Sequence, residues 1–205
     1  MIDFVLHFDR HLAEFVQAYG PWVYGLLFGI VFAETGFVVT PFLPGDSLLF
    51  AAGALCATGE LSMTAMLALL MFAAFAGNAV NFAVGRYIGP RVFQSGHRLL
   101  NRQYLDRAHA FFEQYGGKAV ILGRFVPIVR TFVPFVAGAA QMTPGSFVLY
   151  NAVGAVAWVS LCLGAGWFFG NIPIIKNNFS LVTIGIVFVS VLPMVFEFLA
   201  HRRKP

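Results

Sequence analysis

The sequence is poor in charge and in cysteine. Only 11% of its 205 residues are charged while 59% are hydrophobic, and the mean hydropathy is +0.79. A composition this apolar excludes an ordinary soluble globular domain and predicts an integral membrane protein. The two cysteines, Cys56 and Cys162, have neither CxxC spacing nor a nearby histidine. We therefore expect small buried apolar side chains at both positions, and no disulfide framework, metal site or cofactor.

Patterns typical of enzyme active sites are also missing. The sequence has no Ser-His-Asp or HExxH pattern. A lipid phosphatase with a histidine nucleophile would need that histidine beside its phosphate-binding cations. The five histidines instead fall in the polar flanks of the apolar segments: His7, His11, His97, His109 and His201. We expect that the protein is not an enzyme.

Long uncharged runs predict the membrane segments. A lipid-spanning helix needs about 20 mostly apolar residues, and runs of that size cover residues 15–33, 61–85, 131–175 and 177–196. The first residues lack the positive region of a cleavable signal, so the first hydrophobic helix is expected to direct insertion. Residues 22–39 are either a complete span or the first arm of a hairpin, which leaves three or four full spans and the side of the N-terminus open.

The formal net charge of +4 does not point to nucleic acid, because the basic residues gather in two places. One is the loop at residues 86–118 and the other is the tail at residues 202–204. This is the positive-inside pattern, and it places both segments, and hence the C-terminus, in the cytoplasm. If the proline-broken segments around residues 41–44 and 127–134 each crossed the membrane twice, the two basic segments would lie on opposite sides. We therefore favour two re-entrant hairpins.

The chain contains a weak internal repeat. Each half, about 1–90 and about 96–170, reads as an amphipathic helix, a proline-broken apolar segment, a small-residue signature and an apolar helix. The signatures are AAGAL at 51–55 and VAGAA at 136–140, and the amphipathic helices are expected to end at Gly20 and Pro21 and at Gly116 and Gly117. With a C-terminal span at about 175–199, we predict one all-α polytopic membrane domain: an inverted repeat of amphipathic helix, re-entrant helical hairpin and transmembrane helix. Broken backbone at that depth requires surrounding protein or a water-filled cavity.

Four charged side chains lie in the broken segments: Glu34 and Asp46 in the first, Arg124 and Arg130 in the second. Each costs about 2.5 to 3.5 kcal/mol at the bilayer centre, so all four are expected to face a common hydrated pocket. The arginine fork matches phosphate. Burial opposes the charge of a carboxylate and a nearby guanidinium favours it, so such an acid can load and release a proton. This chemistry favours a proton-coupled carrier of an anionic substrate.

A structural interpretation of these charges stays open. In that alternative the acids are permanently paired with the arginines as a clamp, which predicts that charge-swapped double variants keep their activity. Other polar groups either pack helices or line the cavity. These are Asn78, Asn81 and Asn151, and Trp158 is equally open to both interpretations. The glycine pairs at 25 and 29, 85 and 89, and 166 and 170 predict close helix approach, and the hairpin breaks are assigned to Pro41, Pro44, Gly45, Pro127 and Pro134.

The chain resembles the DedA family of bacterial inner-membrane proteins (VTT or SNARE-associated domain). The resemblance rests on FAETGFVVTPFLPGDSLLFAAGAL, GNAVNFAVGRYIG, YGGKAVILGRFVPIVRTFVPFVAGAAQM and YNAVGAVAW, and it covers almost the whole chain. It implies re-entrant hairpins in an inverted repeat, dependence on the proton motive force, and essential residues matching Glu34, Asp46, Arg124 and Arg130. Where many relatives have Gly-Asp, this sequence has Gly77 and Asn78, so a proton role for that acid is not carried over.

The resemblance also implies a substrate class. Members of the family are implicated in returning undecaprenyl phosphate across the inner membrane, and distant eukaryotic relatives scramble phospholipids. We therefore expect a flippase of an anionic lipid headgroup. In it, Arg124 and Arg130 hold the phosphate while Glu34 and Asp46 carry protons or gate the arginines. Its partners are membrane lipids and protons, not nucleic acid. The alternatives are an enzyme acting on a lipid phosphate, a proton or cation antiporter without lipid substrate, and a general phospholipid scramblase; the oligomeric state is left open.

Overall fold

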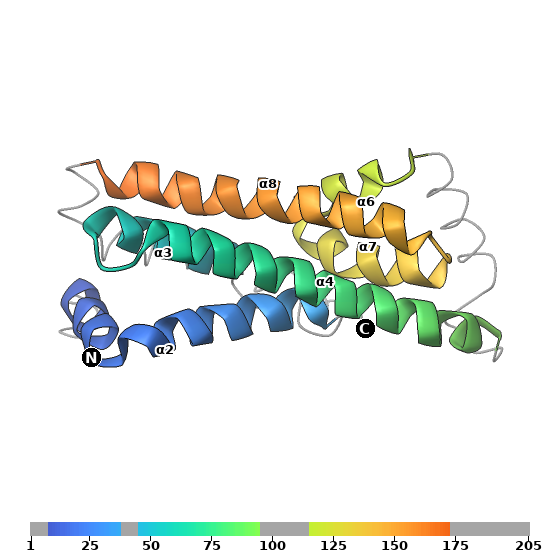
Figure 1. The fold of residues 1–205 in the computed structure, drawn as a ribbon, viewed down its shortest axis with the longest axis horizontal. Coiled ribbons are helices and arrows are strands. Elements are labelled where there is room, and N and C mark those ends of the chain that lie inside the picture. Colours follow the sequence, from blue (N-terminus) through green and yellow to red (C-terminus); the bar gives the residue numbers. More distant parts are fainter. Residues whose placement is uncertain (1–7, 38–44, 95–114, 173–205) are drawn as a thin grey trace, which may run out of the picture. The chain divides into compact units, whose positions relative to one another are not determined.

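The computed structural model describes residues 8–37, 45–94 and 115–172 (Figure 1). Helices are the regular elements of this part of the chain, and no strand occurs in it. The predicted all-α class is therefore confirmed for the described residues. The helices are α2 (Phe8–Gly36), α3 (Gly45–Thr58), α4 (Met63–Gln94), α6 (Lys118–Gly123), α7 (Pro127–Ala139) and α8 (Pro144–Gly170).

Two of these helices are long and apolar enough to cross a membrane. They cover Met63–Gly89 and Pro144–Gly170, with 27 residues each. At about 1.5 Å per residue each exceeds the roughly 30 Å of a hydrocarbon core. The apolar helices α3 and α7 have 14 and 13 residues, too few to cross alone. Their lengths suit the arms of re-entrant hairpins, and that arrangement stays a prediction.

The start of α7 follows directly from its sequence. Val126 precedes Pro127 and has an extended backbone with φ −106° and ψ 109°, because the proline ring disfavours helical geometry in the preceding residue. Proline is well suited to the first helical position, where its missing N–H is not needed. Pro134 lies inside the same helix and is buried. Its missing N–H leaves the carbonyl of Arg130, four residues earlier, without its usual helical bond.

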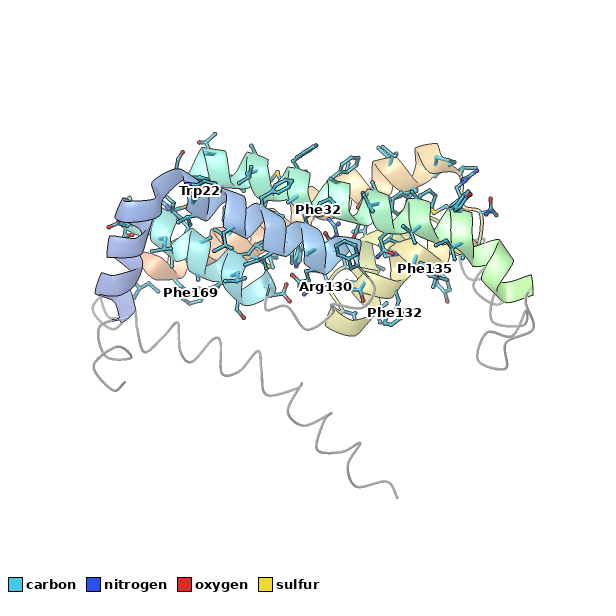
Figure 2. The ribbon with its side chains drawn as sticks, turned by 90° about the horizontal axis from the view of Figure 1, so that it is seen from below. Trp22, Phe32, Arg130, Phe132, Phe135 and Phe169 are labelled. Atoms are coloured by element: carbon cyan, nitrogen blue, oxygen red, sulfur yellow. The ribbon has the colours of Figure 1, made fainter. Side chains whose placement is uncertain are left out.

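The predicted helix end at Gly20 and Pro21 is wrong. Helix α2 continues from Phe8 to Gly36 through both residues. The ribbon changes direction close to Trp22 (Figure 2), which is the expected effect of a proline that removes one helical hydrogen bond without ending the helix. The other predicted amphipathic helix, the breaks at Pro41 and Pro44 and the C-terminal span at about 175–199 lie outside the described residues.

The chain divides into two compact units, each assembled from both halves of the sequence. The first unit comprises residues 1–27, 42–69 and 159–205, and the second comprises residues 28–41 and 70–158. In the first unit, α3 packs on the end of α8 through glycines. A side chain at Gly53 would overlap the carbonyl of Leu163, and one at Gly166 would overlap the carbonyl of Phe50.

The second unit contains the same packing between α7 and the later part of α4. A side chain at Gly138 would overlap the carbonyl of Phe82, and one at Gly85 would overlap the carbonyl of Phe135. Gly138 and Phe135 follow Gly53 and Phe50 by 85 positions, and Phe82 and Gly85 precede Leu163 and Gly166 by 81. The weak repeat of the sequence is therefore a repeat of residue-by-residue packing. Gly25 and Gly29 differ, because a side chain there would meet no atom of the described chain within 4 Å.

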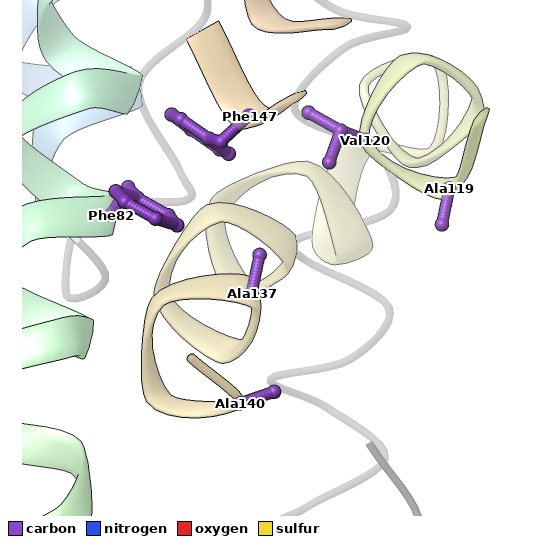
Figure 3. Packing of buried hydrophobic residues seen from close by; sticks show 6 residues of the cluster. All are labelled: Phe82, Ala119, Val120, Ala137, Ala140 and Phe147. Carbon is purple, nitrogen blue, oxygen red and sulfur yellow. The ribbon is translucent and has the colours of Figure 1, made fainter. Parts of the chain in front are cut away.

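A small apolar cluster fixes α6 and α7 within the second unit (Figure 3). Phe82 and Phe147 stack with their ring centroids 4.0 Å apart. A side chain at Gly117 would overlap the ring of Tyr150, so the entry to α6 is closely packed. The other buried members of the cluster are Ala119, Val120, Ala137 and Ala140. This cluster packs both sides of the break between α6 and α7; Arg124 lies in the break and Arg130 lies near the start of α7.

Candidate functional site

The second unit brings three of the four predicted charged residues together. The Arg130 Nη2 donates to the Glu34 Oε1 in an ion pair that joins the end of α2 to α7 (Figure 2). The Glu34 side chain is completely buried and that of Arg130 is 6% exposed. Two charges can be withdrawn from solvent in this way because each neutralises the other.

Arg124 lies six residues earlier, directly after α6. Its side chain is buried and meets neutral oxygens in place of an acid. Its Nη2 donates to the backbone carbonyl of Ala74 at 2.9 Å and to the Oδ1 of Asn151 at 3.2 Å. The Nη1 of Arg124 is buried without a hydrogen-bond partner among the described residues. An unpartnered guanidinium donor is costly to bury, which makes this nitrogen a candidate contact for an anion.

Asn78 completes the surroundings of Arg124. With its amide oxygen turned toward the guanidinium, Asn78 accepts from Arg124 Nη2 at 2.6 Å and donates to the Thr35 carbonyl at 3.3 Å. In the opposite assignment its amide nitrogen donates to Asn151 Oδ1 at 3.2 Å, but that nitrogen then faces the donors of Arg124. We adopt the first assignment, because it removes this clash of donors; the amide oxygens of Asn78 and Asn151, 3.2 Å apart, then both face Arg124 Nη2.

The other two asparagines tie backbone segments together. The Nδ2 of Asn81 donates to the carbonyls of Thr35 at 3.2 Å and Thr131 at 2.8 Å, the residues that follow Glu34 and Arg130. The Nδ2 of Asn151 donates to the Phe75 carbonyl at 3.0 Å, which turns its oxygen toward Arg124. The predicted cavity-lining role therefore fits Asn78, whereas Asn81 acts as a brace and Asn151 holds an arginine.

The sequence did not decide whether Trp158 packs helices together or lines the cavity. Its buried ring lies under both guanidinium groups, with the centroid 5.9 Å from Arg124 Cζ and 5.3 Å from Arg130 Cζ. Cations at this distance over an aromatic face are attracted by its quadrupole. The spacing of seven residues from Asn151 places both residues on one face of α8, a signal that the motif YNAVGAVAW already contained.

The charged groups surround a narrow pocket of about 190 Å³. Its lining residues are Thr35, Asn78, Arg124, Arg130 and Trp158, and the space between them leaves no room for a water-sized sphere. The hydrated pocket predicted from the sequence stays a prediction. Two guanidinium groups line this space, and the Glu34 carboxylate is paired with one of them, Arg130.

The remaining predicted site residues are spread over the described chain. Asp46 lies in the first unit, half-buried in the first turn of α3, where a helix N-terminus favours negative charge. Its part in the site stays a prediction. Gly45 begins α3, Pro127 begins α7 and Pro134 is buried within α7. The neighbouring threonines, Thr35 and Thr131, were missed because hydroxyl groups in apolar helices give no specific signal.

Comparison with known proteins decides the family. The VTT domain model matches residues 43–168, which include both arginines, Asn78, Asn81 and the motif with Trp158. The chain belongs to the VTT domain family, to which the DedA proteins belong. It is 52% identical to Protein DedA of Escherichia coli K12, over 99% of this chain and 94% of that protein. The predicted resemblance to the DedA family is therefore confirmed.

Two further relatives are less similar to this chain. An uncharacterized membrane protein of Mycobacterium tuberculosis H37Rv is 42% identical, over 86% of this chain and 80% of its own length. The inner membrane protein YqjA of Escherichia coli K12 is 35% identical, over 74% of this chain and 70% of its own. No solved structure matches the chain significantly. These names, with the two long apolar helices, support a bacterial inner-membrane protein.

Proposed function

We propose that the protein is a flippase that moves an anionic lipid headgroup across the bacterial inner membrane, driven by the proton motive force. The observation that carries this proposal is the buried guanidinium of Arg124, which lies beside the Glu34–Arg130 pair in the second unit. Arg124 Nη1 has no hydrogen-bond partner in the described chain and Arg130 is held by an internal carboxylate. A phosphate group supplies the missing negative charge and matches the donor geometry of arginine.

Glu34 acts in this proposal as the internal substitute for substrate phosphate. While it is ionised it occupies Arg130 and the pocket stays closed. When Glu34 takes up a proton, it gives up its charge and releases the guanidinium, and phosphate then bridges Arg130 and Arg124. Loss of the proton on the other side reverses the exchange and expels the anion. The Glu34 carboxylate and the phosphate therefore compete for the same arginine, so uptake of one proton and binding of one phosphate occur together, which couples their movements.

The pocket has to open for this exchange. A phosphate headgroup does not fit a space that excludes a water-sized sphere, so the described conformation is the substrate-free, closed form. The lipid tail remains in the bilayer and only the headgroup follows the polar path. Asp46 is proposed as a second proton carrier, and we take the protein to be a carrier and not an enzyme. Undecaprenyl phosphate is the proposed substrate because of the resemblance to the DedA family.

The proposal is tested with protein reconstituted in liposomes and labelled undecaprenyl phosphate under an imposed pH gradient. We expect translocation by the parent and its loss in Arg124→Gln. The matched control is Arg86→Gln, since Arg86 belongs to the same unit and donates to the Met142 carbonyl at 3.1 Å, away from the pocket residues. Equal translocation by parent, Arg124→Gln and protein-free vesicles overturns the proposal. Proton flux without lipid then favours an antiporter, and equal movement of zwitterionic phospholipid favours a scramblase.

A further inference from the structure

The middle of α8 presents three residues to Arg124 from one helix face. Asn151, Gly154 and Trp158 are spaced by three and four positions, which brings them onto one face of a helix. Asn151 Oδ1 accepts from the guanidinium at 3.2 Å. A Cβ at Gly154 would lie 3.5 Å from Ile121 Cα and 3.7 Å from Arg124 Cδ, which are ordinary contact distances, so the aliphatic stem passes close to this position. Trp158 lies under the guanidinium itself.

Each of these three contacts supports a different part of the arginine. The amide oxygen accepts from Nη2, the small residue lies beside the stem, and the indole ring lies under the guanidinium. Asn151 is itself oriented by its bond to the Phe75 carbonyl, so the direction of its acceptor oxygen does not depend on Arg124. The segment therefore has the features of a preorganised support for one side chain.

The ring of Trp158 also lies under the second arginine. Two guanidinium groups repel one another in a buried site, and the Glu34 carboxylate is paired with Arg130. An aromatic face that attracts both cations offsets part of this repulsion without occupying the donors that a phosphate needs. A carboxylate in the same place would neutralise the charge and compete with the anion.

We propose that Asn151, Gly154 and Trp158 form an arginine cradle that positions Arg124, and that the Trp158 ring sets the spacing at which Arg124 and Arg130 take one phosphate group. The three are positioning residues, because they act on substrate through the arginines. The inference rests on the proposed function for the identity of the anion. The cradle itself is a property of the protein without substrate.

The first test needs no lipid substrate. The chain has three tryptophans; Trp22 is 77% exposed and Trp167 is 45% exposed, whereas Trp158 is buried. In the full chain carrying Trp22→Phe and Trp167→Phe, the emission spectrum reports on Trp158 alone. We expect the emission to change when either cation is removed by Arg124→Leu or Arg130→Leu, and to stay constant with Arg86→Leu. Identical spectra for parent, Arg124→Leu and Arg130→Leu overturn the cradle.

The second test measures how the cradle affects substrate. In proteoliposomes with labelled undecaprenyl phosphate, Trp158→Leu is expected to raise KM about tenfold, from the size of a desolvated cation–π contact, with kcat within about twofold. Trp158→Phe keeps an aromatic face and is expected to rescue KM to within about threefold of the parent. Trp167→Leu, on the same helix, is the control. Equal KM for Trp158→Leu and Trp158→Phe overturns the aromatic role even if both variants are less stable.

The amide oxygen is tested by Asn151→Asp, which nearly preserves shape and adds one negative charge. The new carboxylate would pair with Arg124, so KM is expected to rise by at least tenfold. A KM equal to that of the parent overturns the assignment of Asn151. If the parent itself neither binds nor moves the phosphate lipid, the proposed function fails. The emission spectra alone then test whether Trp158 contacts both arginines.

Discussion

Removing one member of the Glu34–Arg130 pair is the perturbation with the largest expected effect on stability. In Glu34→Gln the guanidinium remains at 6% exposure and loses its counter-charge. Breaking a buried pair in this way costs about 3 to 5 kcal/mol, because one charge is left uncompensated. We expect a similar loss for Arg130→Gln, where the completely buried carboxylate is left behind. Unfolding of the purified protein in mixed micelles with increasing SDS, followed by tryptophan emission, measures both.

The double variant separates the stability contributed by the ion pair from the cost of leaving one charge unpaired. In Glu34→Gln with Arg130→Gln neither member of the pair leaves an uncompensated charge behind, so the loss should be smaller than that of either single change by at least about 2 kcal/mol. Glu60→Gln, in the turn between α3 and α4 of the first unit, is the control and should change stability by less than about 0.5 kcal/mol. A loss below about 1 kcal/mol for Glu34→Gln would refute the reasoning.

The same double variant distinguishes a carrier from a structural clamp. If the pair only holds helices together, a double variant that regains stability also regains translocation. In our proposal Arg130 binds phosphate and Glu34 releases it, so the double variant regains stability and stays inactive. The charge-swapped pair, Glu34→Arg with Arg130→Glu, is expected to behave in the same way. Translocation at the parent rate by either double variant would assign the pair to structure alone.

Three further predictions concern packing and topology. Gly166→Ala is expected to lower stability by about 1 to 3 kcal/mol in the same SDS assay, because its new methyl group overlaps the backbone of the neighbouring helix. Gly164→Ala is the control: its methyl group meets open space, so it should be neutral or stabilising. Equal effects of the two substitutions would contradict the close helix packing. Asn81→Ala removes hydrogen bonds to two backbone carbonyls and should lower the free energy of unfolding in SDS by about 1 to 2 kcal/mol. An unchanged unfolding midpoint would contradict its role as a brace. A green fluorescent protein fused after Pro205 should fluoresce because the basic tail is predicted to be cytoplasmic, whereas activity of alkaline phosphatase fused there would place the tail outside.

The charged part of the site could be recognised from the sequence because charge is so rare in it. A carboxylate or guanidinium within a long apolar run has few stable places other than a protein interior, so Glu34, Asp46, Arg124 and Arg130 were all expected to face inward. All but Asp46 are buried. Which acid pairs with which arginine could not be predicted. The pairing depends on how the end of α2 lies against α7, a tertiary relation between residues 96 positions apart.

The roles of the neutral polar side chains could not be predicted from the sequence. Asn78, Asn81 and Asn151 lie in similar apolar surroundings in the sequence, yet one lines the pocket, one braces two backbones and one holds an arginine. Their roles follow from helix faces and neighbours that spacing alone does not define. Glycine spacing is limited in the same way. The pair at 25 and 29 has the spacing of the pair at 85 and 89, but only the second pair lies against another described helix.

The broken segments were recognised from proline, although not every proline acts alike. Pro127 begins a helix, Pro134 is accommodated inside one, and Pro21 lies within a helix that continues past it. A proline removes one donor and restricts the preceding residue, and the surrounding packing decides whether the helix ends, bends or starts there. The repeat was detected through two small-residue signatures, because only small residues allow such close backbone contact.

Infrared difference spectroscopy tests the central claim most directly. The spectrum of the reconstituted protein is recorded with and without undecaprenyl phosphate, for the parent and for Glu34→Gln. If phosphate takes Arg130 from a carboxylate that becomes protonated, the parent shows a new protonated-carboxyl band on lipid binding, and Glu34→Gln binds lipid without it. Phosphate binding with identical difference spectra in parent and Glu34→Gln would contradict the replacement of the Glu34 carboxylate by phosphate at Arg130.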